Sequence, residues 1–225
     1  MKSFLKNRRL IKNIRNFFRT RKIMSESEGQ IKLESPPGKL IYDFINNENI
    51  KNVLEIGTWN GLGSTIVIYE SLEKNNEPYT FTSIETDKIA YQHALKNLKD
   101  KKGIKLVLGR IIDIEDLPNP DLIDFKKHNL NPENIEWFYQ DLRRYKKTKN
   151  IFNELNEFYD FILFDGGEFS TFIEFKKLYK RTKFFALDDI DTYKQYEVLN
   201  YIKNDPDKFE LINTVEDLSI YKVNT

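Results

Sequence analysis

Short apolar runs alternate with longer segments that carry apolar residues at helical spacing along this 225-residue chain. Strands are predicted where the runs are rich in Ile, Leu, Val and Phe. These runs lie at 53–56, 79–85, 104–108, 159–164, 184–187, 209–213 and 218–223. Near-continuous apolar strands separated by helices are typical of a mostly parallel sheet covered on both faces. We therefore expect an α/β fold with a doubly wound, Rossmann-like, seven-stranded sheet.

The first predicted strand, 53–56, contains Glu55 and leads into a turn rich in glycine. Glycine allows a tight turn and lets a ligand approach the backbone closely. Ser64 and Thr65 follow the turn, where either could cap the next helix. The segment predicts a small-molecule site, although a tight strand-to-helix connection without a ligand is the alternative. The glycines of the turn are Gly57, Gly61 and Gly63.

A dinucleotide site would require a different pattern at this turn. The dinucleotide fingerprint, Gly-x-Gly-x-x-Gly, brings a pyrophosphate against the start of a helix. Here Gly57 is followed by Thr58 and Trp59, so the second glycine of that pattern is absent. Trp59 is also bulky at a point where a pyrophosphate needs access to the backbone. The sequence therefore argues against a dinucleotide.

Glu85 ends the second predicted strand, 22 residues beyond Gly63. In doubly wound folds a carboxylate about 20 residues after the glycine turn accepts hydrogen bonds from a ribose diol. Asp87 is better placed to cap the helix predicted at 88–98. We therefore expect Glu85 to bind a ribose, with a solvated strand end as the alternative.

Acids also follow the fourth and fifth predicted strands. Asp165 comes after 159–164, and the adjacent pair Asp188 and Asp189 comes after 184–187. Ligands of such sheets bind beyond the carboxyl ends of the strands, so the three carboxylates should converge. Hard divalent ions such as Mg²⁺ take oxygen ligands of this kind. The alternatives are helix caps, solvated acids, or a pair that binds substrate hydroxyls directly.

The pattern Glu/Asp-x-Gly-x-x-x-Gly, filled here by Glu55, Gly57 and Gly61, resembles motif I of the class I S-adenosylmethionine-dependent methyltransferases. The resemblance covers roughly residues 36–225. The three strand-tip aspartates, Asp165, Asp188 and Asp189, match the metal ligands of the metal-dependent O-methyltransferases. The cofactor contacts implied by the resemblance and by Glu85 are Glu55, Gly57, Thr58, Trp59, Gly61, Ser64 and Glu85.

The resemblance implies transfer of a methyl group from S-adenosylmethionine to a hydroxyl of a small molecule or a sugar or glycan, with help from Mg²⁺ or a similar ion. The segment after Asp165 looks like that of a bacterial subgroup found with polysaccharide or natural-product pathways. Catechol-type enzymes carry a lysine three residues after this aspartate, where this chain has Glu168. Glu168, Asp191 and Lys194 are the candidate general bases.

Two other functions stay open. The nearer is a metal-independent N- or O-methyltransferase in which Asp188 and Asp189 bind the substrate. The farther is a non-catalytic nucleotide-binding protein or scaffold.

Charge divides the chain into a basic arm and an acidic body. Residues 1–24 carry nine Lys or Arg and no acid, and removing these nine charges from the net charge of +1 leaves −8 for the remainder. Leu10, Ile14, Phe17 and Phe18 recur at helical spacing, which makes the arm amphipathic. We rank packing on its own domain or on a partner first, peripheral contact with an anionic membrane second, and nucleic acid third. Its apolar runs are too short for a secretory signal.

We expect one domain at 25–225, with a specificity insertion at 113–149. Within it, 134–147 carries aromatic and basic residues that could line an acceptor pocket or a homo-oligomer contact, or simply form an amphipathic helix. The chain has no cysteine, which excludes disulfides and zinc–thiolate sites and is compatible with the cytoplasm, the expected location.

Overall fold

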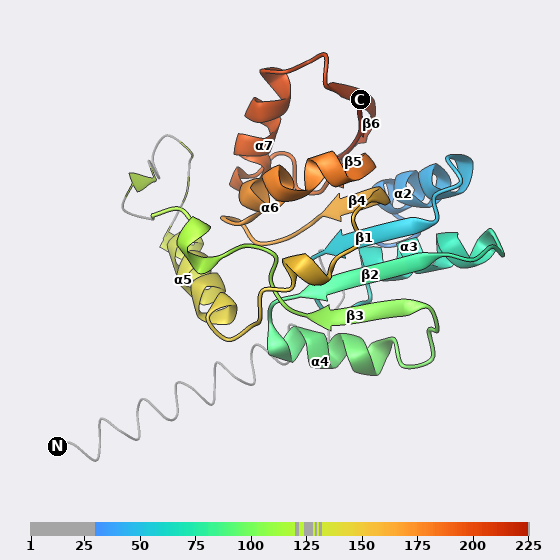
Figure 1. Cartoon of the computed structure of the whole chain (residues 1–225), viewed down its shortest axis with the longest axis horizontal. Helices are drawn as coiled ribbons and strands as arrows, with labels where there is room; N and C mark the ends of the chain where they lie inside the picture. Colours follow the sequence, from blue (N-terminus) through green and yellow to red (C-terminus); the bar gives the residue numbers. More distant parts are fainter. Residues whose placement is uncertain (1–29, 120–121, 124–127, 129, 131, 225) are drawn as a thin grey trace.

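The computed structural model describes residues 30–119, 122, 123, 128, 130 and 132–224 (Figure 1). These residues form a seven-stranded sheet of order β3-β2-β1-β4-β5-β7-β6, in which only β7 runs antiparallel to its neighbours. The expected doubly wound sheet is therefore confirmed. The strands are β1 (Asn52–Ile56), β2 (Thr80–Glu85), β3 (Ile104–Leu108), β4 (Tyr159–Phe164), β5 (Thr182–Leu187), β6 (Phe209–Val215) and β7 (Leu218–Val223).

Helices cover both faces of the sheet. Side chains of β4 alternate between two apolar clusters, with Ile162 and Phe164 in one and Phe161 and Leu163 in the other. The first cluster includes side chains of α6 and α7, and the second includes side chains of α2 and α3. Burial on both faces explains why the strands are almost continuously apolar. The α-helices are α2 (Pro36–Asn47), α3 (Ser64–Lys74), α4 (Lys88–Asn97), α5 (Pro132–Tyr145), α6 (Thr171–Leu178) and α7 (Tyr193–Lys203), and the short 3₁₀ helices are η1 (Ile114–Asp116), η3 (Phe152–Glu154) and η4 (Tyr179–Arg181).

Side-chain caps explain the starts of α2 and α4, but α3, α6 and α7 begin without one. The Ser35 side chain accepts a hydrogen bond from Gly38 N at the start of α2, and Asp87 caps α4 through Ile89 N and Ala90 N, as expected. Helix α3 begins after Gly63 without a side-chain cap. The expectation that Ser64 or Thr65 caps α3 is wrong, because both hydroxyls donate instead to a buried carboxylate described below.

The 113–149 region connects β3 to the β4 side of the sheet and contains η1 and α5. The prediction of a helix at 134–147 is thus confirmed in its main part. The basic arm at 1–24 lies outside the described residues. In the part of the chain that the structure describes, no helix is both long and apolar enough to cross a bilayer.

The order of the sheet fixes where a ligand is expected. The chain winds outward from β1 to β2 and β3, then returns to place β4 on the other side of β1 (Figure 1). A crevice forms outside the carboxyl ends of the strands at such a reversal, and ligands of open α/β sheets bind there. Gly57 and Asp165 directly follow the ends of β1 and β4, respectively.

Candidate functional site

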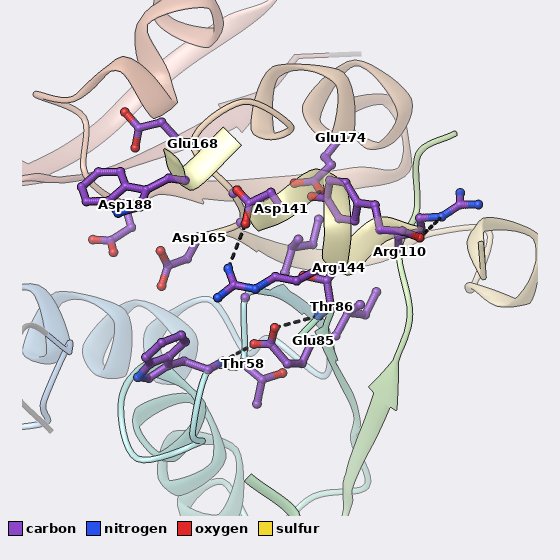
Figure 2. A pocket seen from close by; sticks show the side chains of 18 of the residues that line it. Thr58, Glu85, Thr86, Arg110, Asp141, Arg144, Asp165, Glu168, Glu174 and Asp188 are labelled. Carbon is purple, nitrogen blue, oxygen red and sulfur yellow. Dashed lines mark hydrogen bonds and ion pairs between the residues drawn. The ribbon is translucent and has the colours of Figure 1, made fainter. Parts of the chain in front are cut away.

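A cavity of about 1180 Å³ lies at this reversal point. Its wall combines the turn after β1, the tip of β2, the acids after β4 and β5, and part of α5 (Figure 2). The structure thus brings most of the expected site residues to one place. The expected site residues that line the cavity are Gly57, Thr58, Trp59, Ser64, Glu85, Asp165, Glu168, Asp188 and Asp189. The expected site residues that do not line it are Glu55, Gly61, Asp191 and Lys194.

The turn after β1 has an unusual backbone. Gly57 has a φ of 104° and Trp59 a φ of 52°, which are left-handed values that a bulky residue rarely adopts. The N–H groups of Gly57 and Thr58 both donate to Ile84 O, at 3.0 and 3.1 Å. These bonds anchor the turn to the end of β2, so the backbone of the turn is held beside the next expected site residue.

That residue is Glu85, whose carboxylate organises the cavity from the tip of β2. It accepts hydrogen bonds from the backbone N–H groups of Trp59, Thr86 and Asp87, each at 2.7 Å. Figure 2 shows Glu85 with its bond to Thr86. The left-handed Trp59 is therefore stabilised by the carboxylate that we expect to bind ribose. Each carboxylate oxygen can accept two hydrogen bonds. Oε2 accepts only one from the described residues, so it can also accept a hydrogen bond from a ligand hydroxyl.

Glu55 takes a different position from the one expected. Its side chain is completely buried and accepts hydrogen bonds from the hydroxyls of Ser64, Thr65 and Ser83. Burial raises its pKa to about 7, despite those three hydroxyls. A direct contact of Glu55 with the cofactor is not supported by this geometry. Glu55 instead ties β1, α3 and β2 together beneath the turn.

Gly61 also lies away from the cavity, and its role is steric. A Cβ at this position would lie 2.7 Å from Leu98 Cδ1, and its φ is 79°. The glycine thus allows the turn to pack on α4. The expected contact between Gly61 and the cofactor is likewise not supported.

The three strand-tip aspartates do converge. One carboxylate oxygen from each of Asp165, Asp188 and Asp189 lies within 4.8 Å of the other two. A lysine lies in the same cluster, because Lys194 Nζ is 2.6 Å from Asp165 Oδ1 and 2.5 Å from Asp189 Oδ2. Burial and the neighbouring acids raise the pKa of Asp188 to about 8, although Lys194 acts in the opposite direction.

The candidate bases differ in position. Glu168 lines the cavity and has a pKa raised by burial, which suits a proton acceptor. Asp191 is exposed and lies outside the cavity wall. Lys194 is a poor base: burial alone would lower its pKa, but the three aspartates raise it, so the ammonium stays charged. These ion pairs favour an electrostatic role for Lys194 over the expected role as a proton acceptor.

Helix α5 supplies residues that the motifs did not predict. Arg144 Nε lies 2.7 Å from Asp87 Oδ2. Its NH1 lies 2.9 Å from Asp141 Oδ1 (Figure 2). The guanidinium thus connects α5 to the start of α4, beside Glu85. Asp141 and Arg144 are three residues apart on one helix, a spacing that indicates an ion pair. No local signal could indicate the contact with Asp87, 57 residues away in sequence.

Three buried glutamates predict how stability changes with pH. Burial raises the pKa of Glu55, Glu85 and Glu174 to about 7, whereas unfolded glutamate titrates near about 4.3. The folded protein therefore retains protons that the unfolded chain releases between these values. We expect the free energy of unfolding to fall as the pH rises from about 5 to about 8, with each of the three groups contributing on the order of 1.4 kcal/mol per pKa unit of its shift.

Thermal unfolding of the ligand-free protein at both ends of this range measures the effect. Glu55→Gln should show a weaker dependence on pH than the wild type, since it removes one of the three groups. A melting temperature that rises with pH across the range would contradict the prediction.

Comparison with solved structures identifies the fold. An O-methyltransferase from Bacillus cereus in complex with S-adenosylhomocysteine (SAH) superposes with a TM-score of 0.55 and 16% identity over 84% of this chain and 82% of that one. The O-methyltransferase TomG from Streptomyces achromogenes, in complex with S-adenosylmethionine (SAM), superposes with a TM-score of 0.55 and 15% identity over 87% of this chain and 82% of that one. An rRNA methylase from Streptococcus thermophilus superposes with a TM-score of 0.51 and 13% identity over 85% of this chain and 99% of that one.

No protein-family model matches the sequence, and no curated protein matches it either. The similarity therefore rests on structure, and at these identities it establishes the architecture and not the substrate. The sheet order, the turn after β1 and the cavity at the reversal point agree with that architecture. The chain has the Rossmann-like fold of the SAM-dependent methyltransferases.

Proposed function

We propose that the protein is a SAM-dependent methyltransferase that methylates a hydroxyl group. The observation that supports this most directly is the composition of one cavity wall. The turn after β1 and Glu85 form one part of it, and the aspartate cluster forms another. A cofactor site and a site for a reacting hydroxyl are thus adjacent, as a transfer between two bound molecules requires.

The cofactor part of the cavity fits a nucleoside with a charged tail. Glu85 is fixed by three backbone N–H groups, so it offers a preorganised acceptor to a ribose diol. Gly57 and Gly63 let the backbone line the cavity without side chains. The known structures of this fold that contain SAH or SAM support the same choice of ligand.

The aspartate cluster also fits a divalent cation in its chemistry. Three carboxylate oxygens that lie within 4.8 Å of one another are the hard ligands that Mg²⁺ prefers. When bound, such an ion would lower the pKa of a coordinated hydroxyl. Lys194 Nζ already forms ion pairs with Asp165 and Asp189, so a metal ion would have to displace this ammonium group or bind beside it.

The chemistry of the transfer assigns a task to the residues around the acceptor. The hydroxyl oxygen attacks the methyl carbon of the sulfonium, a C–O bond forms, the S–C bond breaks, and the hydroxyl proton must leave. Glu168 is our proposed proton acceptor, because it lines the cavity and burial raises its pKa. The positive charge of Lys194 lies beside Asp165 and Asp189 and stabilises them as anions.

We propose a small molecule or a sugar or glycan as the acceptor. On the α5 side the cavity is lined by Trp137, Gln140 and Arg143. An aromatic ring with nearby hydrogen-bonding groups is a surface on which a polyhydroxylated or aromatic ligand can pack. The α5 region would then determine which acceptor binds, in keeping with its place in the insertion at 113–149.

A second candidate is favoured by Lys194. Its Nζ already supplies a positive charge to Asp165 and Asp189, so the cluster can exist without an added ion. In that case the enzyme is metal-independent and Asp188 and Asp189 bind the acceptor. Full methyl transfer in the presence of a chelator would select this candidate.

Calorimetric titration of the purified protein with SAH tests the cofactor proposal. We expect micromolar binding in the wild type and binding weaker by about 10- to 100-fold in Glu85→Ala, because the one charge-assisted hydrogen bond that Oε2 can still accept from the ribose is lost, about 1.5–3 kcal/mol. The same variant frees three backbone N–H groups, so thermal unfolding must show that it is folded. Methyl transfer to a panel of phenols, catechols and sugars then identifies the acceptor.

Glu197→Ala is the matched control, because Glu197 is an exposed glutamate on α7. It should bind SAH like the wild type. Absence of SAH binding in the folded wild-type protein would refute the proposed function. Unchanged binding in Glu85→Ala would refute the role of Glu85.

A further inference from the structure

Arg144, on α5, lines the cavity but has no task in the proposed function. Figure 2 shows its side chain between Asp141 and Glu85. The guanidinium forms ion pairs with Asp87 and Asp141, whose side chains are each only 15% exposed. Among the described residues, these are the only ion pairs that either acid forms. Two largely buried acids beside the cofactor site therefore depend on one arginine for their counter-charge.

Asp87 connects this arginine to Glu85. The Oδ2 atom of Asp87 accepts a hydrogen bond from Arg144 Nε at 2.7 Å. Its Oδ1 atom accepts hydrogen bonds from Ile89 N and Ala90 N at the start of α4. Its own backbone N–H donates to Glu85 Oε1 at 2.7 Å. Asp87 is thus held by α4 through one oxygen and by α5 through the other, which fixes the N–H group that orients Glu85.

The same residues determine the electrostatic environment of Glu85. Burial, the largest effect, raises the pKa of Glu85 to about 7. The carboxylate of Asp87 acts in the same direction, whereas two backbone N–H groups and the charge of Arg144 oppose it. Other titratable residues on the elements around Glu85 are Glu55 on β1, Arg110 after β3, Asp141 and Tyr145 on α5, and Asp165 after β4.

We propose that Arg144 is a positioning residue of the cofactor site, which holds Asp87 against Glu85 and supplies the counter-charge that the ribose-binding carboxylate needs. This inference rests on the proposed function. A carboxylate accepts stronger hydrogen bonds when it is ionised, so the affinity for the cofactor depends on that counter-charge. Arg144 belongs to α5, other residues of which line the acceptor side of the cavity. The helix that we propose to select the acceptor therefore also completes the cofactor site.

Affinity for SAH at two pH values separates this role from simple docking of α5. Calorimetric titrations of the full chain compare the wild type with Arg144→Met. Without the counter-charge the pKa of Glu85 should rise, so more of it is protonated at the lower pH. We expect Arg144→Met to bind SAH about tenfold more weakly than the wild type at about pH 6.5, which corresponds to a shift of about one pKa unit. At about pH 8.5, where Glu85 is mostly ionised in both proteins, the difference should shrink to about threefold or less.

Further variants serve as controls, and thermal unfolding at both pH values shows which of them are folded. Arg144→Lys keeps the positive charge and should recover most of the affinity that Arg144→Met loses at the lower pH. Arg144→Gln keeps hydrogen-bond donors without the charge, so it should behave like Arg144→Met and replaces it if that variant does not fold. Lys146→Met removes an exposed cation just beyond α5 and outside the cavity wall, and it should change the affinity at neither pH.

The outcomes are distinguishable. Wild-type affinity of Arg144→Met at the lower pH would overturn the inference. An equal loss of affinity at both pH values would show that Arg144 only docks α5, and would overturn it too. A loss in Arg144→Lys as large as in Arg144→Met would overturn the role as a counter-charge. These three results would leave the proposed function intact, whereas absence of SAH binding to the wild type would refute the proposed function, and this inference with it.

Discussion

Gly57→Ala should lower the free energy of unfolding by about 4 kcal/mol or more, or prevent folding altogether. A Cβ at Gly57 would lie 2.0 Å from the backbone O of Asp165, and the φ of 104° is already costly for alanine. The backbone of Asp165 cannot easily move away, because its N–H donates to Ile56 O at 3.0 Å. The contact joins β1 to β4 at the point where the cavity forms.

Urea denaturation followed by circular dichroism measures the loss. Gly167→Ala is the matched control, because a Cβ there would meet only the ends of the Asp141 and Ser170 side chains, at 2.9 and 3.0 Å. We expect the control to cost about 1 kcal/mol or less, as a small adjustment of those side chains relieves the contact. Equal losses of stability in the two variants would mean that the close contact between position 57 and Asp165 O is not the reason that Gly57→Ala is destabilising.

Lys194→Met is the second variant with a large expected effect. Lys194 is 6% exposed and pairs with Asp165 and Asp189, so its removal leaves a cluster of acids without a counter-charge. Removing one partner of a buried ion pair costs about 3–5 kcal/mol, and we expect the lower end because the side chain of Asp189 is 44% exposed. Millimolar Mg²⁺ or Mn²⁺ should restore more stability to this variant than to the wild type.

Thermal unfolding with and without the ion gives both results. Lys194→Arg retains the charge and should respond to the ion like the wild type. Lys203→Met removes an exposed lysine from the end of α7 and should change neither quantity. A wild-type melting temperature in Lys194→Met would show that its ion pairs contribute nothing. An equal ion response in Lys194→Met and the wild type would refute competition between lysine and metal.

The sequence predicts the sheet well because burial on both faces leaves a strong local signal. The β4 strand, for example, is apolar at consecutive positions that enter two different cores. The acids at the ends of β2, β4 and β5 are also predictable, since a short apolar run followed by an acid identifies a strand tip. Parallel neighbours then bring these tips together without any further information.

The environment of each site residue is less predictable. Glu55 and Glu85 both end or nearly end a strand, yet one is buried beneath the turn and the other faces the cavity. Both side chains lie on the same face of the sheet, because Glu55 pairs with Ser83, two residues before Glu85 on β2. The difference depends on Glu85 being the last residue of its strand and on three hydroxyls from two other elements that surround Glu55. The pairing of Lys194 with Asp165 and the contact of Arg144 with Asp87 depend on tertiary packing alone.

The two ion pairs of Arg144 have a consequence for protein engineering. The pair with Asp87 connects α5 to the residue that caps α4, next to the N–H groups that hold Glu85, and the pair with Asp141 fixes the guanidinium within α5. The 113–149 segment is therefore not a self-contained cassette that can be exchanged to redirect the enzyme to a new acceptor. A chimera would have to carry an arginine at this position, together with an acid matching Asp87 in the recipient, or the donated helix would dock in the wrong place.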